Sequence, residues 1–129
     1  MATWRRRALE LFPELQPELN RSEYTINVLF FDLSSFVGEA HRARDDKRLA
    51  DIYGFAEWCA RQRSQPLWNS AGLAFYEHAF DEPSLSEAVA AWLPANIRAD
   101  HLGLWKARLE PEAFARVKRV LARVPPHGS

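Results

Sequence analysis

The side chains of this sequence that could carry acid–base chemistry or bind a ligand are two histidines and four carboxylates: His41, Asp45, Glu57, Glu77, His78 and Asp81. His41 and Asp45 are four residues apart, the spacing at which two side chains share one face of a helix. Asp45 also stands directly before an apolar helical pattern, so we expect it to cap that helix rather than act with His41. Glu57 precedes Arg61 by four residues, and an ion pair between them explains the carboxylate, with a place in a groove as the alternative.

Glu77 and His78 are adjacent in the chain and form the second candidate group. Adjacent helical residues point about 100° apart, so the two could hold one metal ion only with ligands from another helix. The sequence has no Glu-x-x-His or His-x-x-x-His spacing, and we therefore expect no metal site. His78 follows Ala74 and Phe75 on an apolar face, which favours a buried, hydrogen-bonded histidine over a ligand. Glu57, Glu77 and His78 are candidate catalytic residues only if folding brings them together.

Four aromatic residues are the candidates for a binding surface: Tyr53, Trp58, Trp68 and Tyr76. Tyrosine and tryptophan are enriched where proteins contact partners, but these four also fit apolar helical stripes, where they would be core residues. Trp68, for example, falls with Leu67 and Ala71 on a face that we expect to be buried. The sequence has one cysteine, Cys59, and this count excludes a disulfide framework and a cysteine-based zinc site. We expect Cys59 to be a small buried hydrophobe. The five glycines form no phosphate loop or dinucleotide motif, so we expect no cofactor.

Helical periodicity runs along the whole chain, and no segment keeps the two-residue alternation of a strand. The apolar pattern and its breaks predict seven short helices that begin near residues 3, 22, 45, 66, 84, 97 and 111. A loop is expected over 13–20, where two prolines break the first helix. Ser22 and Asp45 are the predicted N-caps of the second and third helices, and Ser84–Glu87 has the spacing of a capping box.

These elements predict the all-α fold class. Short connections join the second helix to the third, the fourth to the fifth and the sixth to the seventh. We therefore expect stacked antiparallel pairs in a layered α-α superhelix, with an irregular helical bundle as the alternative. Apolar residues on two sides of the third and fourth helices favour the layered arrangement.

Length and charge bound the domain count and the partners. The chain has 129 residues, of which 47% are hydrophobic and 26% charged, enough for one core and too few for two. We expect a single domain over 1–127, with Gly128 and Ser129 either native or left by an expression vector.

Acidic and basic residues balance at 17 each, although the part from Arg98 onward has seven basic against three acidic residues. The zero net charge argues against nucleic acid or an anionic membrane as a partner. Since neither a targeting signal nor an apolar span is visible, we expect a cytoplasmic protein.

Three stretches resemble a family of small uncharacterised bacterial proteins: Phe30–Leu33, Ile52–Cys59 and Leu67–His78. The resemblance spans about half of the chain. It implies a small helical protein of the α-α superhelix kind, related in architecture to armadillo and HEAT repeats, with no established activity. It provides no catalytic motif that could be carried over to this sequence.

Three functions are compatible with these patterns. The first is a non-enzymatic helical domain that binds a protein partner in a groove, as a monomer or homodimer, and it requires exposure of Trp58, Trp68 or Tyr76. The second is a small-molecule- or metal-binding protein or a small enzyme, and it requires His41, Glu57, Glu77 and His78 to converge, with Tyr53 nearby. The third, an immunity-type partner of a toxin, rests on size and compartment alone.

Overall fold

The computed structural model describes residues 1–128, and no strand occurs between them. Eight α-helices are present in this range: α1 (Thr3–Leu11), α2 (Gln16–Leu19), α3 (Ile26–Ala43), α4 (Asp46–Ala60), α5 (Gln65–Ser70), α6 (Ser86–Ala91), α7 (Ala95–Arg108) and α8 (Pro111–Arg123). The same range contains four further helical turns. Three are 3₁₀ turns, η1 (Pro13–Leu15), η3 (Tyr76–His78) and η4 (Pro83–Leu85), and one is the π-helical turn η2 (Ala71–Phe75). The predicted all-α class is confirmed.

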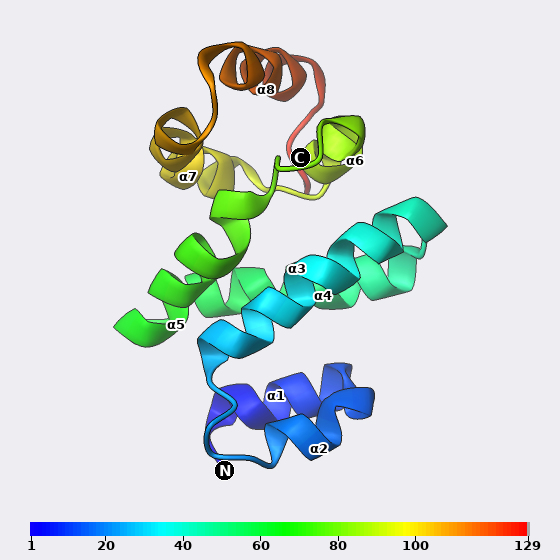
Figure 1. The fold of residues 1–129 in the computed structure, drawn as a ribbon, viewed down its shortest axis with the longest axis vertical. Helices are drawn as coiled ribbons and strands as arrows, with labels where there is room; N and C mark the ends of the chain where they lie inside the picture. Colours follow the sequence, from blue (N-terminus) through cyan, green and yellow to red (C-terminus); the bar gives the residue numbers. More distant parts are fainter. Residues whose placement is uncertain (129) are drawn as a thin grey trace.

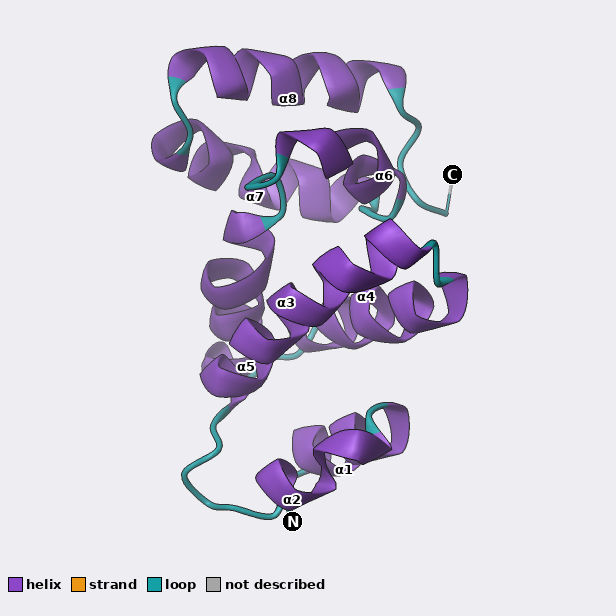
Figure 2. Ribbon diagram, turned by 45° about the vertical axis from the view of Figure 1, so that its right-hand side comes forward, coloured by secondary structure: helices purple, strands orange, loops and turns teal. Residues whose placement is uncertain are grey.

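The helices lie in three layers (Figure 1). α1 and α2 form the layer at the N-terminal end, α3 and α4 lie side by side in the middle, and α6, α7 and α8 form the layer at the C-terminal end. α5 and the turns after it lead from the middle layer to the C-terminal layer, as Figure 2 also shows. Of the expected pairs, α3 contacts α4 and α7 contacts α8. α6 packs mainly on α8 instead of α5, because the intervening turns carry the chain into the C-terminal layer.

Both helices of the middle layer begin at a side-chain cap. Thr25 accepts a hydrogen bond from the Val28 N–H at 3.4 Å and starts α3, so the prediction of Ser22 as its cap was wrong. Ser22 lies instead in a turn that the Arg5 guanidinium holds through the carbonyls of residues 19, 21 and 22. The predicted cap Asp45 is confirmed, because its carboxylate accepts the Arg48 N–H at 3.1 Å.

Two other local predictions were wrong because proline starts helical turns as readily as it breaks them. Residues 13–20 form η1 and α2 instead of a loop, with a proline within the first two residues of each, where an N–H is not needed. Leu15 and Leu19 are buried by this arrangement. The run Ser84–Glu87 is not a capping box, because Pro83 starts η4 and α6 then begins without a side-chain cap.

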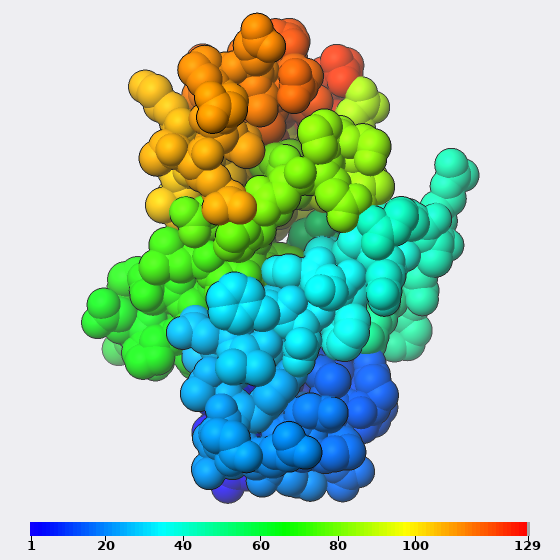
Figure 3. Space-filling model, viewed as in Figure 1, coloured from blue at the N-terminus to red at the C-terminus, as the bar shows by residue number. Residues whose placement is uncertain are grey.

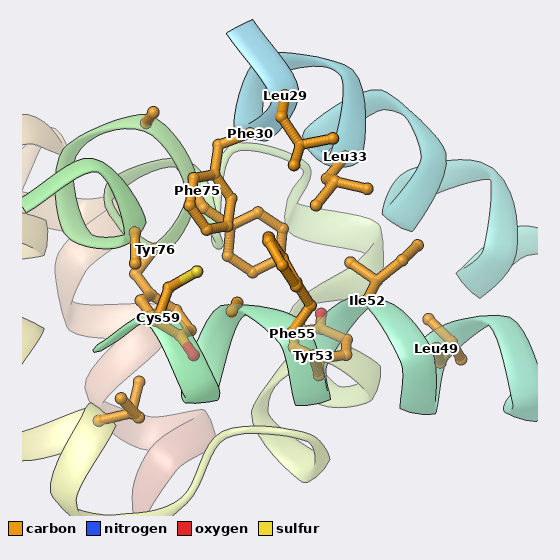
Figure 4. Close-up of a cluster of buried hydrophobic side chains, with 14 of the residues drawn as sticks. Leu29, Phe30, Leu33, Leu49, Ile52, Tyr53, Phe55, Cys59, Phe75 and Tyr76 are labelled. Atoms are coloured by element: carbon orange, nitrogen blue, oxygen red, sulfur yellow. The ribbon is translucent and has the colours of Figure 1, made fainter. Parts of the chain in front are cut away.

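The core sits where α3, α4 and the turns after α5 meet (Figure 4). Phe30 of α3 lies between Phe55 of α4 and Phe75 of η2, with ring centroids 5.7 Å from each. Cys59 is fully buried in this cluster, as expected of a small hydrophobe. Across the described residues, no helix combines the length and the apolar character needed to cross a lipid bilayer.

Candidate functional site

Two hollows are lined by candidate histidine or aromatic residues. The first, which we call the central pocket, has a volume of about 150 Å³ and is bounded by α3, α4, α6 and the segment 75–85. His41 and Tyr53 line it from α3 and α4, and His78, Asp81 and Glu82 line it from the segment after η2. Figure 3 shows the hollow near the centre of this face, where the cyan surface of α3 meets the green segment.

His78 is oriented in the central pocket by a carboxylate. A turn closed by the Asp81 N–H and the His78 carbonyl, 3.1 Å apart, brings the Asp81 side chain back to the ring. His78 Nδ1 is 3.0 Å from Asp81 Oδ2, and Arg108 of α7 donates from Nε and Nη2 to the two oxygens of the same carboxylate. Burial raises the pKa of Asp81, but hydrogen bonds from Arg108 and His78 outweigh burial, so its pKa lies below the ordinary value. The ionised carboxylate therefore accepts from Nδ1–H and leaves Nε2 of His78 as the second ring nitrogen.

His41 and Tyr53 form a buried pair on the opposite side of the pocket. His41 Nε2 lies 2.7 Å from the Tyr53 hydroxyl, and His41 is only 7% exposed. Burial lowers the pKa of His41, with the charge of Glu82 opposing the shift, and burial raises the pKa of Tyr53. Both groups are therefore uncharged near neutral pH. Tyr53 also stacks on Trp92 at an interplanar angle of 7°, which fixes its ring.

The rim and wall of the central pocket differ in character. At the rim, Arg42 donates from Nη1 to both carboxylate oxygens of Glu82, at 3.2 and 2.9 Å. The wall is mostly apolar and includes Val37, Phe75 and Val89. The pocket is therefore an apolar space with two imidazole rings facing it and two arginine-paired carboxylates at its edge.

The second hollow, which we call the lateral groove, has a volume of about 590 Å³ and lies between α5, η2 and α7. Trp68 is 43% exposed there and Leu73 is 45% exposed, so the prediction that Trp68 is buried was wrong. Trp68 lies in α5 just before the π-helical turn η2, so the 3.6-residue period that placed it on one face with Phe75 does not continue through this segment. The groove is completed by Ala60, Asn69, Gly72, Asp100, His101 and Leu104.

His101 gives the lateral groove a hydrogen-bond acceptor. Its Nδ1 lies 2.7 Å from the Ile97 carbonyl, which can only accept, so Nδ1 carries the ring hydrogen. In the neutral ring, Nε2 then has a lone pair. Nε2 is next to Gly72, where an added Cβ would lie 3.3 Å away, and this small residue leaves room for the ring. Nε2 of His101 and the carboxylate of Asp100 make the groove rich in hydrogen-bond acceptors.

The structure brings some of the predicted site residues together and separates others. Tyr53 and His78 share the central pocket with His41, so His78 is half-buried beside a cavity and not enclosed in the core. Glu57 lies 3.5 Å from Arg61, the pairing expected from the sequence, and Glu57 and Glu77 line neither hollow.

Trp58 and Tyr76 are placed differently from Trp68. Trp58 is half-buried beneath the Arg7 guanidinium, and Tyr76 is buried in the core. Burial raises the pKa of Cys59 to about 12, with the charge of Arg7 opposing the shift, so the thiol is protonated near neutral pH. Neither the Trp58 ring nor the Cys59 thiol lines the central pocket or the lateral groove.

Several residues of the two hollows were not predicted from the sequence. The spacing of His78 and Asp81, three residues apart, could have predicted their pairing. Arg42 and Glu82 are 40 residues apart in the chain, and no local pattern connects them. Among residues 1–128, no group of three or more histidine, cysteine, aspartate or glutamate side chains could hold a metal ion.

Comparison with known proteins gives one match. A family model described as "Domain of unknown function (DUF7674)" matches residues 5–110, from α1 to the residue before α8. No curated protein and no solved structure matches the chain.

Proposed function

The chain belongs to the DUF7674 family of domains of unknown function, and from the lateral groove we propose that it is a non-enzymatic domain that binds an arginine-bearing segment of a protein partner. The observation that carries the proposal is Trp68, which lines the groove and is 43% exposed. Exposed tryptophans over concave surfaces are the residues that most often dominate the binding energy of protein interfaces.

The polar groups of the groove select the chemistry of the partner. Asp100 supplies a carboxylate, Asn69 an amide and His101 a lone pair on Nε2, whereas no lysine or arginine lines the groove. The groove is therefore arranged to accept hydrogen bonds and to attract positive charge.

Arginine fits these groups better than lysine. A guanidinium is planar, stacks on tryptophan and still donates several N–H groups at its edge, while its aliphatic stem covers apolar side chains such as Leu73 and Leu104. An ammonium group would reach Asp100 but would not stack on Trp68. An immunity protein that inhibits a toxin would be one example of this class, but no residue of the groove specifies a toxin over another partner.

Selection from a library of random peptides displayed on phage tests the proposal on the intact protein. We expect the selected peptides to contain arginine next to an apolar residue. By calorimetry, Trp68→Ala should weaken these peptides about tenfold or more, because it removes the stacking surface. Asp100→Asn should weaken them as well, with a smaller dependence on salt.

Phe31→Ala is the matched control, because Phe31 is also a large exposed aromatic residue, 58% exposed, but does not line the groove. It should leave peptide affinity unchanged. The proposal is overturned if no peptide is enriched, if the enriched peptides lack basic residues, or if Trp68→Ala binds them as tightly as the original protein.

A further inference from the structure

We infer that the central pocket is a binding site for a small, uncharged, planar molecule that carries both a hydrogen-bond donor and an acceptor, such as a phenol. This site is separate from the lateral groove and does not depend on the function proposed for it. The inference rests on the size of the pocket, on the two imidazole rings and on the charges at its rim.

The size and wall of the pocket fit a single aromatic ring. A cavity of about 150 Å³ with an apolar lining is large enough to take benzene in other proteins. Here the wall includes Val37, Phe75 and Val89, so a ring-sized molecule would contact aliphatic and aromatic carbon on several sides.

His41 provides the hydrogen-bond donor. The Tyr53 hydroxyl stays protonated and lies 2.7 Å from His41 Nε2, and within this inference we assign the phenol as the donor and Nε2 as the acceptor. The hydrogen of the neutral imidazole is then on Nδ1, which has no hydrogen-bond partner among residues 1–128. An acceptor atom of a ligand in the pocket would give this N–H a hydrogen-bond partner.

His78 provides the hydrogen-bond acceptor. Its Nδ1–H donates to Asp81, which Arg108 holds in place through two hydrogen bonds. Because Nδ1 carries a hydrogen, Nε2 is a hydrogen-bond acceptor whenever the ring is neutral, and the contacts at Nδ1 fix the orientation of this ring, which lines the pocket. A ligand O–H or N–H would donate to it.

The charges around the pocket exclude a charged ligand. Asp81 and Glu82 stand at the rim and would repel an anion, and both are already paired with arginines, which leaves little attraction for a cation. Transfer of either kind of ion into the apolar space would also lose hydration without compensation. The pocket therefore favours an uncharged molecule with polar atoms at its edge.

Titration of the histidine-labelled protein with phenol, benzene and benzoate, followed by NMR, tests the inference. We expect saturable binding of phenol, with larger shifts for the imidazoles of His41 and His78 than for those of His101 and His127. Benzene should bind more weakly and benzoate should not bind. Equal shifts at all four histidines, the absence of saturable binding, or benzoate binding as tight as that of phenol would overturn the inference.

Two variants locate the bound molecule. His78→Phe keeps a ring but removes the acceptor, so it should weaken phenol about threefold to tenfold and leave benzene affinity unchanged. Ala79→Leu should block both ligands by filling the pocket, whereas Ala88→Leu, on the exposed face of α6, should block neither. The inference fails if phenol and benzene respond equally to His78→Phe, a comparison that remains valid even if Ala79→Leu does not fold.

Discussion

His41 is a buried histidine whose only hydrogen-bond partner among the described residues is the Tyr53 hydroxyl. Protonation would place a charge on a buried ring beside a neutral phenol, which is why burial lowers the pKa of His41. The negative groups that face this space, Glu82 and Asp81, are paired with Arg42 and Arg108 and offset only part of that cost.

The lowered pKa of His41 predicts that stability falls as the pH is lowered. Between the folded-state pKa and the ordinary value of about 6.5, the unfolded chain binds a proton that the folded chain does not. The free energy of unfolding, measured with urea, should therefore decrease as the pH drops below about 6.5. His41→Gln should reduce this decrease, and His127→Gln, at an exposed position, should not. An NMR titration that gives His41 a pKa at or above the ordinary value would contradict the prediction.

At the scale of residues, the sequence predicts the chemistry of local pairs and misses that of distant ones. Glu57 and Arg61, one helical turn apart, are paired as their spacing indicates. The two histidines of the central pocket come from α3 and η3, and only the packing of the helices decides that they share a cavity. The apolar face on which His78 falls separates it from His127, which lies on the surface, but no sequence pattern connects His78 with His41.

At the scale of elements, one arginine joins the ends of two helices. The side chain of Arg98 in α7 is 8% exposed, and its guanidinium donates to five backbone carbonyls. These belong to residues 90 and 93 at the end of α6 and residues 121, 124 and 125 at the end of α8. Carbonyls at helix C-termini lack intrahelical partners and carry partial negative charge, so they stabilise a buried cation without a carboxylate.

Removal of this guanidinium should destabilise the protein strongly. Arg98→Met keeps the apolar stem but leaves several buried carbonyls without donors, and we expect a loss of about 3 kcal/mol or more in the free energy of unfolding. The free energy of unfolding of Arg98→Lys should lie between those of the original protein and Arg98→Met, because an ammonium has three donors for five acceptors. Arg119→Met, at an exposed position of α8, is the control and should change stability by less than about 0.5 kcal/mol. Equal urea midpoints for the Arg98 and Arg119 variants would contradict the role of Arg98.

Periodicity predicts the long helices well because they are regular. α3 and α4 follow an uninterrupted 3.6-residue pattern, and their shared boundary at Asp45 follows from capping. The segment after α5 changes from α to π to 3₁₀ geometry within residues 70–78, and a single period cannot describe it. The exposure of Trp68, on which the lateral groove depends, could not be predicted for this reason.

At the scale of the whole molecule, aromatic rings connect the three layers. Phe12 near α1 contacts Phe55 of α4 with centroids 5.9 Å apart, and the contacts continue through Phe30 and Phe75 to Tyr76. The Tyr76 carbonyl then accepts the indole N–H of the fully buried Trp105 in α7, at 2.8 Å. The core is therefore continuous from the N-terminal to the C-terminal layer.

A continuous core predicts that the three layers unfold together. Native-state hydrogen exchange should give similar opening free energies for the amides of Ala8, Phe55 and Trp105, which are fully buried residues in α1, α4 and α7. Arg98→Met offers the sharper measurement, because it perturbs contacts within the C-terminal layer alone. If the layers form one cooperative unit, this variant should lower all three opening free energies equally. A decrease confined to Trp105 would instead show that α6, α7 and α8 open as a separate unit, and the single domain expected for residues 1–127 would then have to be divided after the turns that follow α5.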